Sequence, residues 1–587
     1  MGEIRTLLDI FAAWRETLPE PALVDARGGA TAATSASQVT RQVAGLAKGL
    51  ADLGIRAGDR VALLSANRPE WHIVDFAVQH LGAADVPIYT TLLAAQVAAI
   101  MADSGSRAVV VDNRDQLAKV LEVRPRCPAL EHVLLIDGPA PPDVTLLADC
   151  TVAMSAEEAA TFLEACRPRV TPADLATIIY TSGTTGEPKG AMLTHDNFVF
   201  NAISASAAVP WPEEKDVALS FLPISHVLER LVDYVDLLKG STMAYCGVLE
   251  VAESFRLVRP TIFTAVPRVY EKIYDRIFQE VASAPKIRQL VFRTAIRVAT
   301  EALRTGRKGL AWHVLDRLAC AKVRAAFGGR LRFSISGGAP LAVYVGEFLH
   351  AVGIRVLEGY GLTETSPVIA ANTYDRPKLG TVGPAIAGVE VRIADDGEIL
   401  TRGRHVMKGY WNSPAATAAM IDGEGWLATG DIGELDADGY LHITDRKKDI
   451  LVTAGGKNIA PQPNENQLKA SPLVENAVLF GDRRPYIVAL IVPNFEELER
   501  WARQHGLPVE QRVGLVTAPE VVQLYHDIVD GVDASLARFE TIKKFRLLAQ
   551  PLTMDSGELT PTLKVKRRQI ENRYGHLIDA MYAEPGA

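Results

Sequence analysis

The chain contains 587 residues with a formal net charge of −8, and 48% of its residues are hydrophobic. Its length exceeds what one hydrophobic core usually supports, so we expect two or more packed units. The negative charge excludes a general attraction to nucleic acid, which requires Lys and Arg to neutralise phosphates. Five cysteines without a CxxC pair argue against a zinc site or a disulfide framework, so we expect a cytoplasmic protein.

Short β-branched runs alternate with helical stretches along the first part of the chain. We expect strands at residues 60–64, 107–111, 132–136, 176–181, 261–265 and 332–336. This alternation favours an α/β fold in which helices cover buried strands. Several of these strands run into Gly- or Ser-rich turns, and ligands bind at such strand ends in open α/β sheets.

The strand expected at 176–181 leads into the segment Thr181-Ser182-Gly183-Thr184-Thr185-Gly186-Glu187-Pro188-Lys189-Gly190. Its glycines let backbone amides approach an anion, its hydroxyls donate hydrogen bonds, and Lys189 adds a positive charge. The chain has no Walker A motif and no Gly-x-Ser-x-Gly elbow, which disfavours a P-loop ATPase and a serine hydrolase. We therefore predict a phosphate-binding loop of another kind.

A basic helical insertion is expected at about residues 270–332. Between Lys286 and Arg332 the chain has twelve Lys or Arg against two acidic residues, interleaved with apolar residues such as Leu290 and Trp312. Two interpretations stay open. The segment is the solvated face of a helical insertion, or its basic face contacts anionic lipid at the inner face of the membrane. No stretch of the sequence approaches the roughly 20 apolar residues that span a bilayer.

The pattern of expected secondary structure changes towards the C-terminus. From about Val382 to Leu441, turn dipeptides such as Asp396-Gly397 separate short strands, which predicts a smaller β-rich subdomain. The run from Asp445 to Asp449 places five charges in succession, so we expect a solvated linker between the large unit and a C-terminal unit.

The segment from Thr181 to Gly190 resembles the phosphate loop of the adenylate-forming superfamily, which includes acyl-CoA synthetases, firefly luciferase and nonribosomal peptide adenylation domains. Further segments resemble that superfamily in the same order: the adenine-binding turn Gly337-Gly338-Ala339-Pro340, the nucleotide and magnesium segment Gly359–Thr365, the ribose segment Trp426–Asp431 and the hinge Asp445–Asp449. The resemblance covers nearly the whole chain. It implies an α/β N-terminal domain of stacked subdomains plus the β-rich subdomain, residues 1–446, and a small mobile α+β C-terminal domain, residues 447–587.

The resemblance implies a role for each matching residue. ATP or AMP would contact Thr181, Ser182, Gly183, Thr184, Thr185, Gly186, Lys189, Gly338, Ala339, Pro340, Tyr360, Gly361, Thr363, Asp431 and Arg446. In this assignment the ring of Tyr360 packs against adenine, Thr363 binds the α-phosphate, and Asp431 accepts the ribose hydroxyls. Mg²⁺ would be held by Thr184 and Glu364, since it prefers oxygen ligands.

Two further segments complete the expected site. Pro223-Ile224-Ser225-His226 resembles the junction between the nucleotide and acyl pockets, which implies a positioning role for His226; a purely structural histidine is the alternative. Gly557–Lys566 resembles the loop with the adenylation lysine, which would be Lys564. Lys566 stays open as an alternative, because Thr562-Leu563 precedes Lys564 where most members have Ser-Gly.

The same resemblance assigns Lys447 as the hinge residue and Gly455 with Gly456 to coenzyme A. Asn464, where relatives usually have Ile, is left without an interpretation.

The implied activity is ligation of a long-chain or medium-chain fatty acid to coenzyme A through an acyl adenylate, with ATP consumed and AMP and pyrophosphate released. The segment Thr261–Tyr270 and the basic insertion resemble long-chain members. Three alternatives remain: a fatty acyl-AMP ligase that delivers to a carrier protein, an aryl or amino acid adenylating enzyme, and a non-catalytic lipid-binding scaffold at the membrane. The sequence predicts no oligomeric state.

Overall fold

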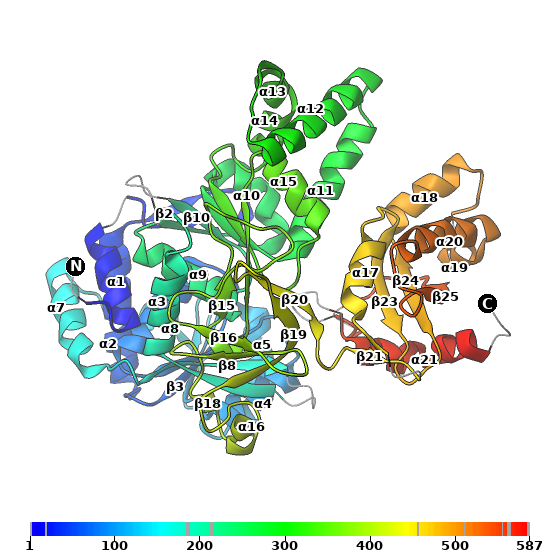
Figure 1. Ribbon diagram of the computed structural model, residues 1–587. Coiled ribbons are helices and arrows are strands. Elements are labelled where there is room, and N and C mark those ends of the chain that lie inside the picture. Colours follow the sequence, from blue (N-terminus) through cyan, green and yellow to red (C-terminus); the bar gives the residue numbers. More distant parts are fainter. Residues whose placement is uncertain are drawn as a thin grey trace.

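The computed structural model describes residues 3–17, 20–182, 188–211, 216–454, 457–509, 511–553, 556–559 and 565–583. Figure 1 shows a large body formed by the first part of the chain, a helical projection that rises from it, and a smaller body formed by the C-terminal part. The loop residues Gly183, Thr184, Thr185 and Gly186, the pair Gly455 and Gly456, and Lys564 lie outside the described residues.

Two large sheets form the main body in the described part of the chain. One sheet has the order β18-β9-β8-β4-β3-β5-β6-β7. Its strands are β3 (Arg60–Leu64), β4 (Ala84–Ile88), β5 (Ala108–Val111), β6 (His132–Leu135), β7 (Thr145–Leu146), β8 (Leu175–Ser182), β9 (Pro188–Thr194) and β18 (Gly409–Tyr410). Its strands β3 to β8 are parallel, whereas β9 and β18 are antiparallel to their neighbours.

The second sheet has the order β15-β14-β13-β12-β10-β11-β1-β2, with a parallel centre and an antiparallel strand at each edge. Its strands are β1 (Leu23–Asp25), β2 (Ala32–Thr34), β10 (Val217–Ser220), β11 (Thr242–Tyr245), β12 (Ile262–Ala265), β13 (Phe333–Ser336), β14 (Val356–Gly361) and β15 (Val368–Ala371). All six strands expected from the sequence are present in these two sheets.

The two sheets share one hydrophobic core. Buried residues of both sheets pack in one cluster with α1 (Leu7–Thr17), α2 (Ala36–Asp52), α3 (Pro69–His80), α8 (His195–Ser206) and α9 (Val227–Leu238). The other face of each sheet packs in a separate cluster, one with α4 (Ala94–Ser104) and α5 (Arg114–Val123), the other with α10 (Val251–Val258) and α15 (Val343–Ala351). This stacking of two α/β layers confirms the expected fold class.

The β-rich part follows as an antiparallel sheet in the order β16-β17-β19-β20. Its strands are β16 (Glu390–Ile393), β17 (Glu398–Arg402), β19 (Leu427–Leu435) and β20 (Leu441–Arg446). The C-terminal body pairs β21 (Leu451–Val452) with β22 (Asn458–Ile459) and builds a sheet from β23 (Val474–Phe480), β24 (Ile487–Pro493) and β25 (Ile542–Leu547). Helices α17 (Pro461–Lys469), α18 (Phe495–Gln504), α19 (Arg512–Thr517), α20 (Pro519–Asp533) and α21 (Arg567–Ala583) complete it.

The expectation that all of Asp445–Asp449 is a solvated linker is wrong for its first residue. Asp445 is buried at the end of β20, where its carboxylate accepts hydrogen bonds from the backbone N–H groups of Gln462, at 3.0 Å, and of Arg446, at 2.6 Å. Burial raises the pKa of Asp445 to about 6. Lys447 and Lys448 are exposed, as expected for a linker.

The projection in Figure 1 consists of α11 (Pro267–Ala282), α12 (Lys286–Thr305), α13 (Leu310–Leu315), a π-helical turn (Asp316–Cys320) and α14 (Ala321–Ala326). Helix α12 buries Phe292, Ala295, Ala299 and Ala302, which recur at helical spacing and face the body. The C-terminal body contacts α11, because Arg268 pairs with Glu475 at 3.2 Å. Within the described ranges, no helix combines the length and apolar character that crossing a membrane requires.

Candidate functional site

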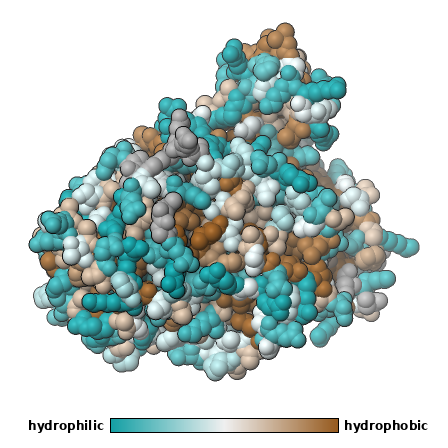
Figure 2. Space-filling model, turned by 60° about the vertical axis from the view of Figure 1, so that its left-hand side comes forward, coloured by the Kyte–Doolittle hydropathy of each residue, from teal (hydrophilic) through white to brown (hydrophobic). Residues whose placement is uncertain are grey.

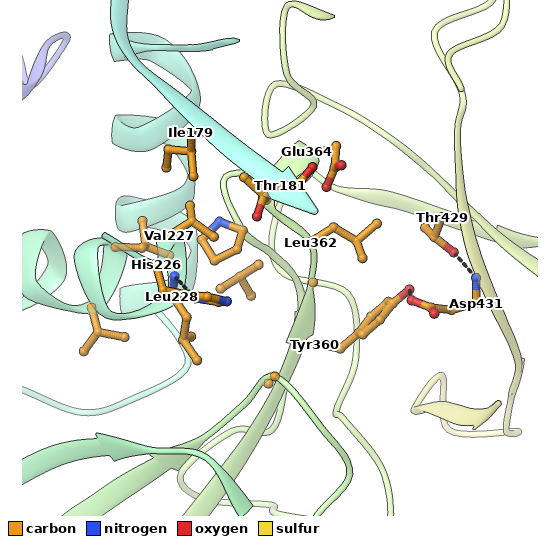
Figure 3. A pocket seen from close by; sticks show the side chains of 18 of the residues that line it. Ile179, Thr181, His226, Val227, Leu228, Tyr360, Leu362, Glu364, Thr429 and Asp431 are labelled. Carbon is orange, nitrogen blue, oxygen red and sulfur yellow. Dashed lines mark hydrogen bonds between the residues drawn. The ribbon is translucent and has the colours of Figure 1, made fainter. Parts of the chain in front are cut away.

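A cavity of about 780 Å³ lies at the carboxyl ends of the central strands of the second sheet and continues along α9. Figure 3 shows the two kinds of side chain that face it: apolar groups and His226 from α9 on one side, and Tyr360, Glu364, Thr429 and Asp431 on the other. Polar and apolar parts of one cavity thus meet near His226. Such a shape suits a ligand that has both a charged and an apolar portion.

The phosphate-binding segment is held at both ends by an antiparallel pair of strands. Thr181 on β8 pairs with Lys189 on β9, and Ser182 pairs with Pro188. Thr181 and Lys189 both line the cavity. The strand pair therefore brings both ends of the expected loop to the cavity, although its central residues are not described.

The expected adenine turn follows β13. Gly338 has φ of +81°, a conformation that favours glycine, and it lines the cavity. Ala339 and Pro340 follow in the turn without being among the described lining residues. The turn is fixed by Glu358, a residue that the sequence analysis missed: its Oε2 accepts a hydrogen bond from the backbone N–H of Leu341 at 3.2 Å. Burial raises the pKa of Glu358 to about 7.

Tyr360, Asp431 and Arg446 come together from three strands. The Tyr360 hydroxyl donates a hydrogen bond to Asp431 Oδ2 at 2.7 Å, and Arg446 Nε lies 3.5 Å from Asp431 Oδ1. Backbone pairing of β19 with β20 places Asp431 opposite Arg446. Burial, and then the charge of Asp431, raises the pKa of Tyr360, so the phenol stays protonated and remains a donor.

Glu364 lies in a short 3₁₀ turn, Thr363–Thr365, directly after β14. Both Thr363 and Glu364 line the cavity. Gly361 is required before them, because a Cβ at this position would lie 1.7 Å from the carbonyl oxygen of Pro367. The close packing of this backbone against β15 thus determines where the turn begins.

Tyr410 is a second residue that the sequence analysis missed. Its hydroxyl donates a hydrogen bond to Glu364 Oε1 at 2.6 Å, and Lys189 Nζ lies 5.4 Å from the centre of its ring. It reaches this place because the short strand β18 leaves the β-rich part and pairs with β9. Tyr410 therefore links the expected metal-binding carboxylate to the expected phosphate-binding lysine. A single Tyr that follows a Gly does not by itself indicate a functional residue, so the sequence could not predict this role of Tyr410.

No group of three or more His, Cys, Asp or Glu that could hold a metal ion occurs among the described residues. Magnesium does not require such a group, since it is commonly bound by one or two carboxylates together with substrate phosphates and water. Glu364, at the cavity wall and connected to Lys189 through Tyr410, fits that kind of site. Thr184, the other expected ligand, is not described.

His226 has a structural role that can be seen directly. It is the N-cap of α9, and its Nδ1 accepts a hydrogen bond from the backbone N–H of Leu228 at 3.2 Å (Figure 3). This bond requires Nδ1 to be unprotonated, so the neutral ring carries its proton on Nε2. Because the side chain also lines the cavity, capping and a positioning role are compatible.

The apolar part of the cavity is formed largely by one face of α9. Leu228, Leu231, Val232 and Val235 recur at spacings of three and four, so they share a face of the helix, and all four line the cavity. The opposite wall and the end contain Ala205, Ala208, Val209, Trp211, Ile262, Phe333 and Ile335. An extended hydrocarbon chain fits such a wall, because every buried methylene is stabilised by about 0.8 kcal/mol.

The C-terminal part contributes Lys448, Asp449 and Lys566 to the cavity lining. The backbone N–H of Lys566 donates to the carbonyl of Glu558 at 2.8 Å, and Leu559 forms an isolated β-bridge with Val565. Lys447, the expected hinge, is exposed, and its Nζ pairs with Asp396 at 2.6 Å and Glu398 at 2.7 Å.

Two family models match the chain. One, described as AMP-binding enzyme, matches residues 11–411, and the other, described as AMP-binding enzyme C-terminal domain, matches residues 448–585. The long-chain-fatty-acid–CoA ligase FadD15 of Mycobacterium bovis is 41% identical over 557 residues, which cover 93% of this chain and 92% of that protein. The peroxisomal long chain acyl-CoA synthetase 7 of Arabidopsis thaliana is 34% identical, with 92% of this chain and 80% of that protein covered.

Solved structures resemble this fold over almost the whole chain. The A domain of a carboxylic acid reductase from Segniliparus rugosus, solved in complex with AMP and a co-purified carboxylic acid, aligns with a TM-score of 0.74 at 22% identity. The alignment covers 99% of this chain and 95% of that one. At this identity the likeness concerns the fold alone.

Proposed function

The chain belongs to the family of AMP-binding enzymes, and on that premise we propose that it is a long-chain-fatty-acid–CoA ligase. The observation that carries this proposal is one cavity with two parts: a polar part formed by Lys189, Tyr360, Glu364 and Asp431, and an apolar part along α9. The first suits ATP and the second suits an acyl chain. The names of the relatives that align over more than nine tenths of this chain support the same activity.

The reaction has two halves. In the first, a carboxylate oxygen of the fatty acid attacks the α-phosphorus of ATP, and the bond to pyrophosphate breaks. In the second, the sulfur of coenzyme A attacks the acyl carbon, and the bond to AMP breaks. Neither half needs a nucleophile from the protein, so the residues act by positioning and by stabilising charge.

We assign the binding of ATP and Mg²⁺ to different described residues. Asp431, with Tyr360 and Arg446 around its carboxylate, would accept the ribose hydroxyls, and Gly338, which has a positive φ, would let the chain pass close to the adenine. Thr181 and Lys189 would bind phosphate oxygens, which carry the charge that grows as pyrophosphate leaves. Glu364 would bind the Mg²⁺ that accompanies ATP, which offsets phosphate charge.

The test is the conversion of ATP to AMP by the purified protein with fatty acids of graded length, with and without coenzyme A. We expect AMP and acyl-CoA to form together and to be greatest with long chains. Acyl adenylate without transfer to coenzyme A would instead favour a carrier-protein acceptor. Turnover with aryl acids or amino acids alone would favour the alternative of an aryl or amino acid adenylating enzyme. No turnover with any acid would favour the non-catalytic lipid-binding scaffold.

We also propose that the C-terminal body turns about Lys447 between the two half-reactions. The backbone N–H of Lys447 donates to the carbonyl of Gly430 at 2.8 Å, and its side chain pairs with Asp396 and Glu398. A turn must break these contacts and change the backbone dihedral angles of this residue. In that model Lys564 reaches the site during adenylation, whereas Gly455 and Gly456 reach it with coenzyme A.

The substitution Lys447→Pro should slow at least one half-reaction by about tenfold or more, because proline fixes φ and has no N–H to donate. The matched control is Lys447→Ala, which removes both ion pairs but leaves the backbone free, and which should change each rate less than threefold. Each half-reaction is measured alone in single turnover. Normal rates of both halves in Lys447→Pro would contradict the hinge assignment.

We propose, as a second point, that the helical projection contacts anionic membrane surfaces. Lys286, Arg293, Arg297 and Arg304 share the exposed face of α12, opposite its buried face. Large apolar side chains are exposed on the same projection, among them Ile287, Leu290, Leu303, Leu310, Val314 and Leu318. In Figure 2 hydrophobic side chains gather at the tip of the projection, next to hydrophilic ones. Basic and apolar groups together suit a lipid surface.

We expect the protein to float with vesicles that contain phosphatidylglycerol at low salt, and to float much less with neutral phosphatidylcholine vesicles or at high salt. The triple substitution of Arg293, Arg297 and Arg304 by Glu should weaken binding at least about tenfold, since each basic residue near the surface contributes roughly 1 kcal/mol.

The matched control places the same charge change elsewhere, at the exposed residues Arg126, Arg483 and Arg568. Equal loss of flotation in both triple variants would show an effect of net charge only. Absence of wild-type flotation at low salt would contradict the proposal.

A further inference from the structure

Helix α11, the first helix of the projection, carries a polar face along its length. Four residues share this face because they follow one another at spacings of three and four: Arg268, Glu271, Asp275 and Gln279. All four are half-buried, whereas the side chain of Arg276 on the same helix is 69% exposed. Polar side chains of a helix are ordinarily exposed unless another part of the protein covers them. We call these four residues the contact face of α11.

The C-terminal body reaches the contact face at two places. Near the start of α11, Arg268 Nη2 lies 3.2 Å from Glu475 Oε1, which belongs to β23. Near its end, the side-chain amide of Gln279 donates a hydrogen bond to Glu497 Oε1 of α18 at 2.6 Å. One ion pair and one hydrogen bond therefore join the projection to two different elements of the C-terminal body.

These two contacts together determine an orientation. Gln279 follows Arg268 by eleven positions, which corresponds to about 16 Å along the helix. A body that turns about a hinge cannot keep two contacts so far apart on one helix, because a rotation displaces them by different amounts. In the orientation seen in this structure, Lys566 from the C-terminal loop lines the cavity. The contacts of α11 thus belong to the orientation that brings this loop to the cavity.

Both contacts can open without leaving a buried charge unpaired. Arg268 has a second partner on its own helix, Glu271, whose Oε2 lies 3.6 Å from Arg268 Nη1. Glu497 has a second partner on α18, Arg500, at 2.7 Å. Removing the partner of a buried charge is costly, whereas Arg268 and Glu497 each keep a partner and gain water when the two bodies separate. Such an interface favours a reversible contact, as is typical of polar contacts between domains.

We infer that Arg268 and Gln279 are positioning residues for the first half-reaction. Through Glu475 and Glu497 they hold the C-terminal body in the orientation that brings its lysine-containing loop to the cavity, and they release it when the body turns for the second half-reaction. The inference rests on the proposed acyl-CoA ligase activity and on the proposed turn about Lys447. Neither residue is among the described residues that line the cavity, so both act through the C-terminal body and not on the reacting atoms.

The experiment measures two single-turnover rates with the full-length protein: pyrophosphate release with a fatty acid that the wild type activates, and transfer from preformed acyl adenylate to coenzyme A. Arg268→Glu places a carboxylate opposite Glu475 and should lower the first rate about fivefold, because like charges repel where an ion pair stood. The second rate should not fall. Glu475→Arg should have the same effect, and the double variant Arg268→Glu with Glu475→Arg should restore the first rate to within about twofold of the wild type.

Two further variants separate positioning from general effects. Arg276→Glu makes the same charge change at an exposed position of α11, so it should change neither rate more than about twofold. Gln279→Lys replaces the neutral hydrogen bond to Glu497 by an ion pair, which stabilises the contact. It should leave the first rate unchanged and slow the second about threefold, because the body then leaves α11 less readily.

Several outcomes would overturn the inference: an unchanged first rate in Arg268→Glu, an equal loss in Arg276→Glu, or a double variant that stays as slow as the single ones. Equal loss of both half-reactions in Arg268→Glu would show damage to the fold and would overturn it too. If Arg268→Glu does not fold, Gln279→Lys decides, since an unchanged second rate would contradict the inference. Failure of the wild type to activate any acid would instead overturn the proposed function.

Discussion

Replacing Glu364 with Gln should lower the rate of adenylation by about 10²–10³-fold, the loss seen when one preorganised charge-stabilising group is removed from an active site. Glu364 lines the cavity, and its Oε1 accepts the hydroxyl of Tyr410, so the substitution keeps the size and one acceptor but removes the charge. The measurement is single-turnover release of pyrophosphate over a range of Mg²⁺ concentrations. A magnesium-binding role further requires that the half-saturating Mg²⁺ concentration rises in the variant.

The matched control is Tyr410→Phe. This variant keeps the ring near Lys189 and removes only the hydrogen bond to Glu364, so the rate should fall about tenfold, the lower end of what a hydrogen bond to a charged group contributes. If Glu364→Gln loses no more activity than Tyr410→Phe, the carboxylate does not bind the metal. Its place beside Tyr410 would then be structural.

Much of the fold could be predicted because short β-branched runs alternate with helices, and this local signal does not depend on tertiary context. The strand at 60–64 was predicted to the residue. The partners of Tyr360 could not be predicted, because its hydrogen bond to Asp431 joins residues 71 positions apart. The same applies to Tyr410, whose place depends on the pairing of β18 with β9. Such pairings are decided by packing over the whole domain.

Asp445 shows why the exposure of every residue in a run of charges could not be predicted from the local sequence alone. A run of charges predicts exposure when each side chain is considered alone, but a buried carboxylate is tolerated where backbone N–H groups satisfy it. Here one N–H belongs to Gln462, 17 residues further along the chain. Conversely, the role of Glu358 could not be predicted, because nothing in the sequence relates it to Leu341. The backbone N–H of Leu341 donates a hydrogen bond to the carboxylate of Glu358.

The assignment of the adenylation lysine is a prediction that can be decided by comparing two variants. Lys566 lines the cavity and is fixed by the hydrogen bond from its backbone N–H to Glu558. Lys564 lies outside the described residues, and its role is implied by resemblance. Lys564→Ala should lower the adenylation rate by about 10²–10³-fold, because one positive charge between the carboxylate and the α-phosphate is lost. Lys566→Ala should lower it less than about tenfold.

The second half-reaction distinguishes a catalytic charge from a damaged C-terminal body. If that body turns after adenylation, a lysine that acts only in the first orientation has no part in the attack by coenzyme A. Lys564→Ala supplied with preformed acyl adenylate should therefore transfer the acyl group at close to the wild-type rate. If Lys564→Ala loses both half-reactions, Lys564 has a structural role. If Lys566→Ala lowers the adenylation rate more than Lys564→Ala does, Lys566 is the adenylation lysine. Either result would fix the register of the loop, which the sequence leaves open because two lysines lie two residues apart.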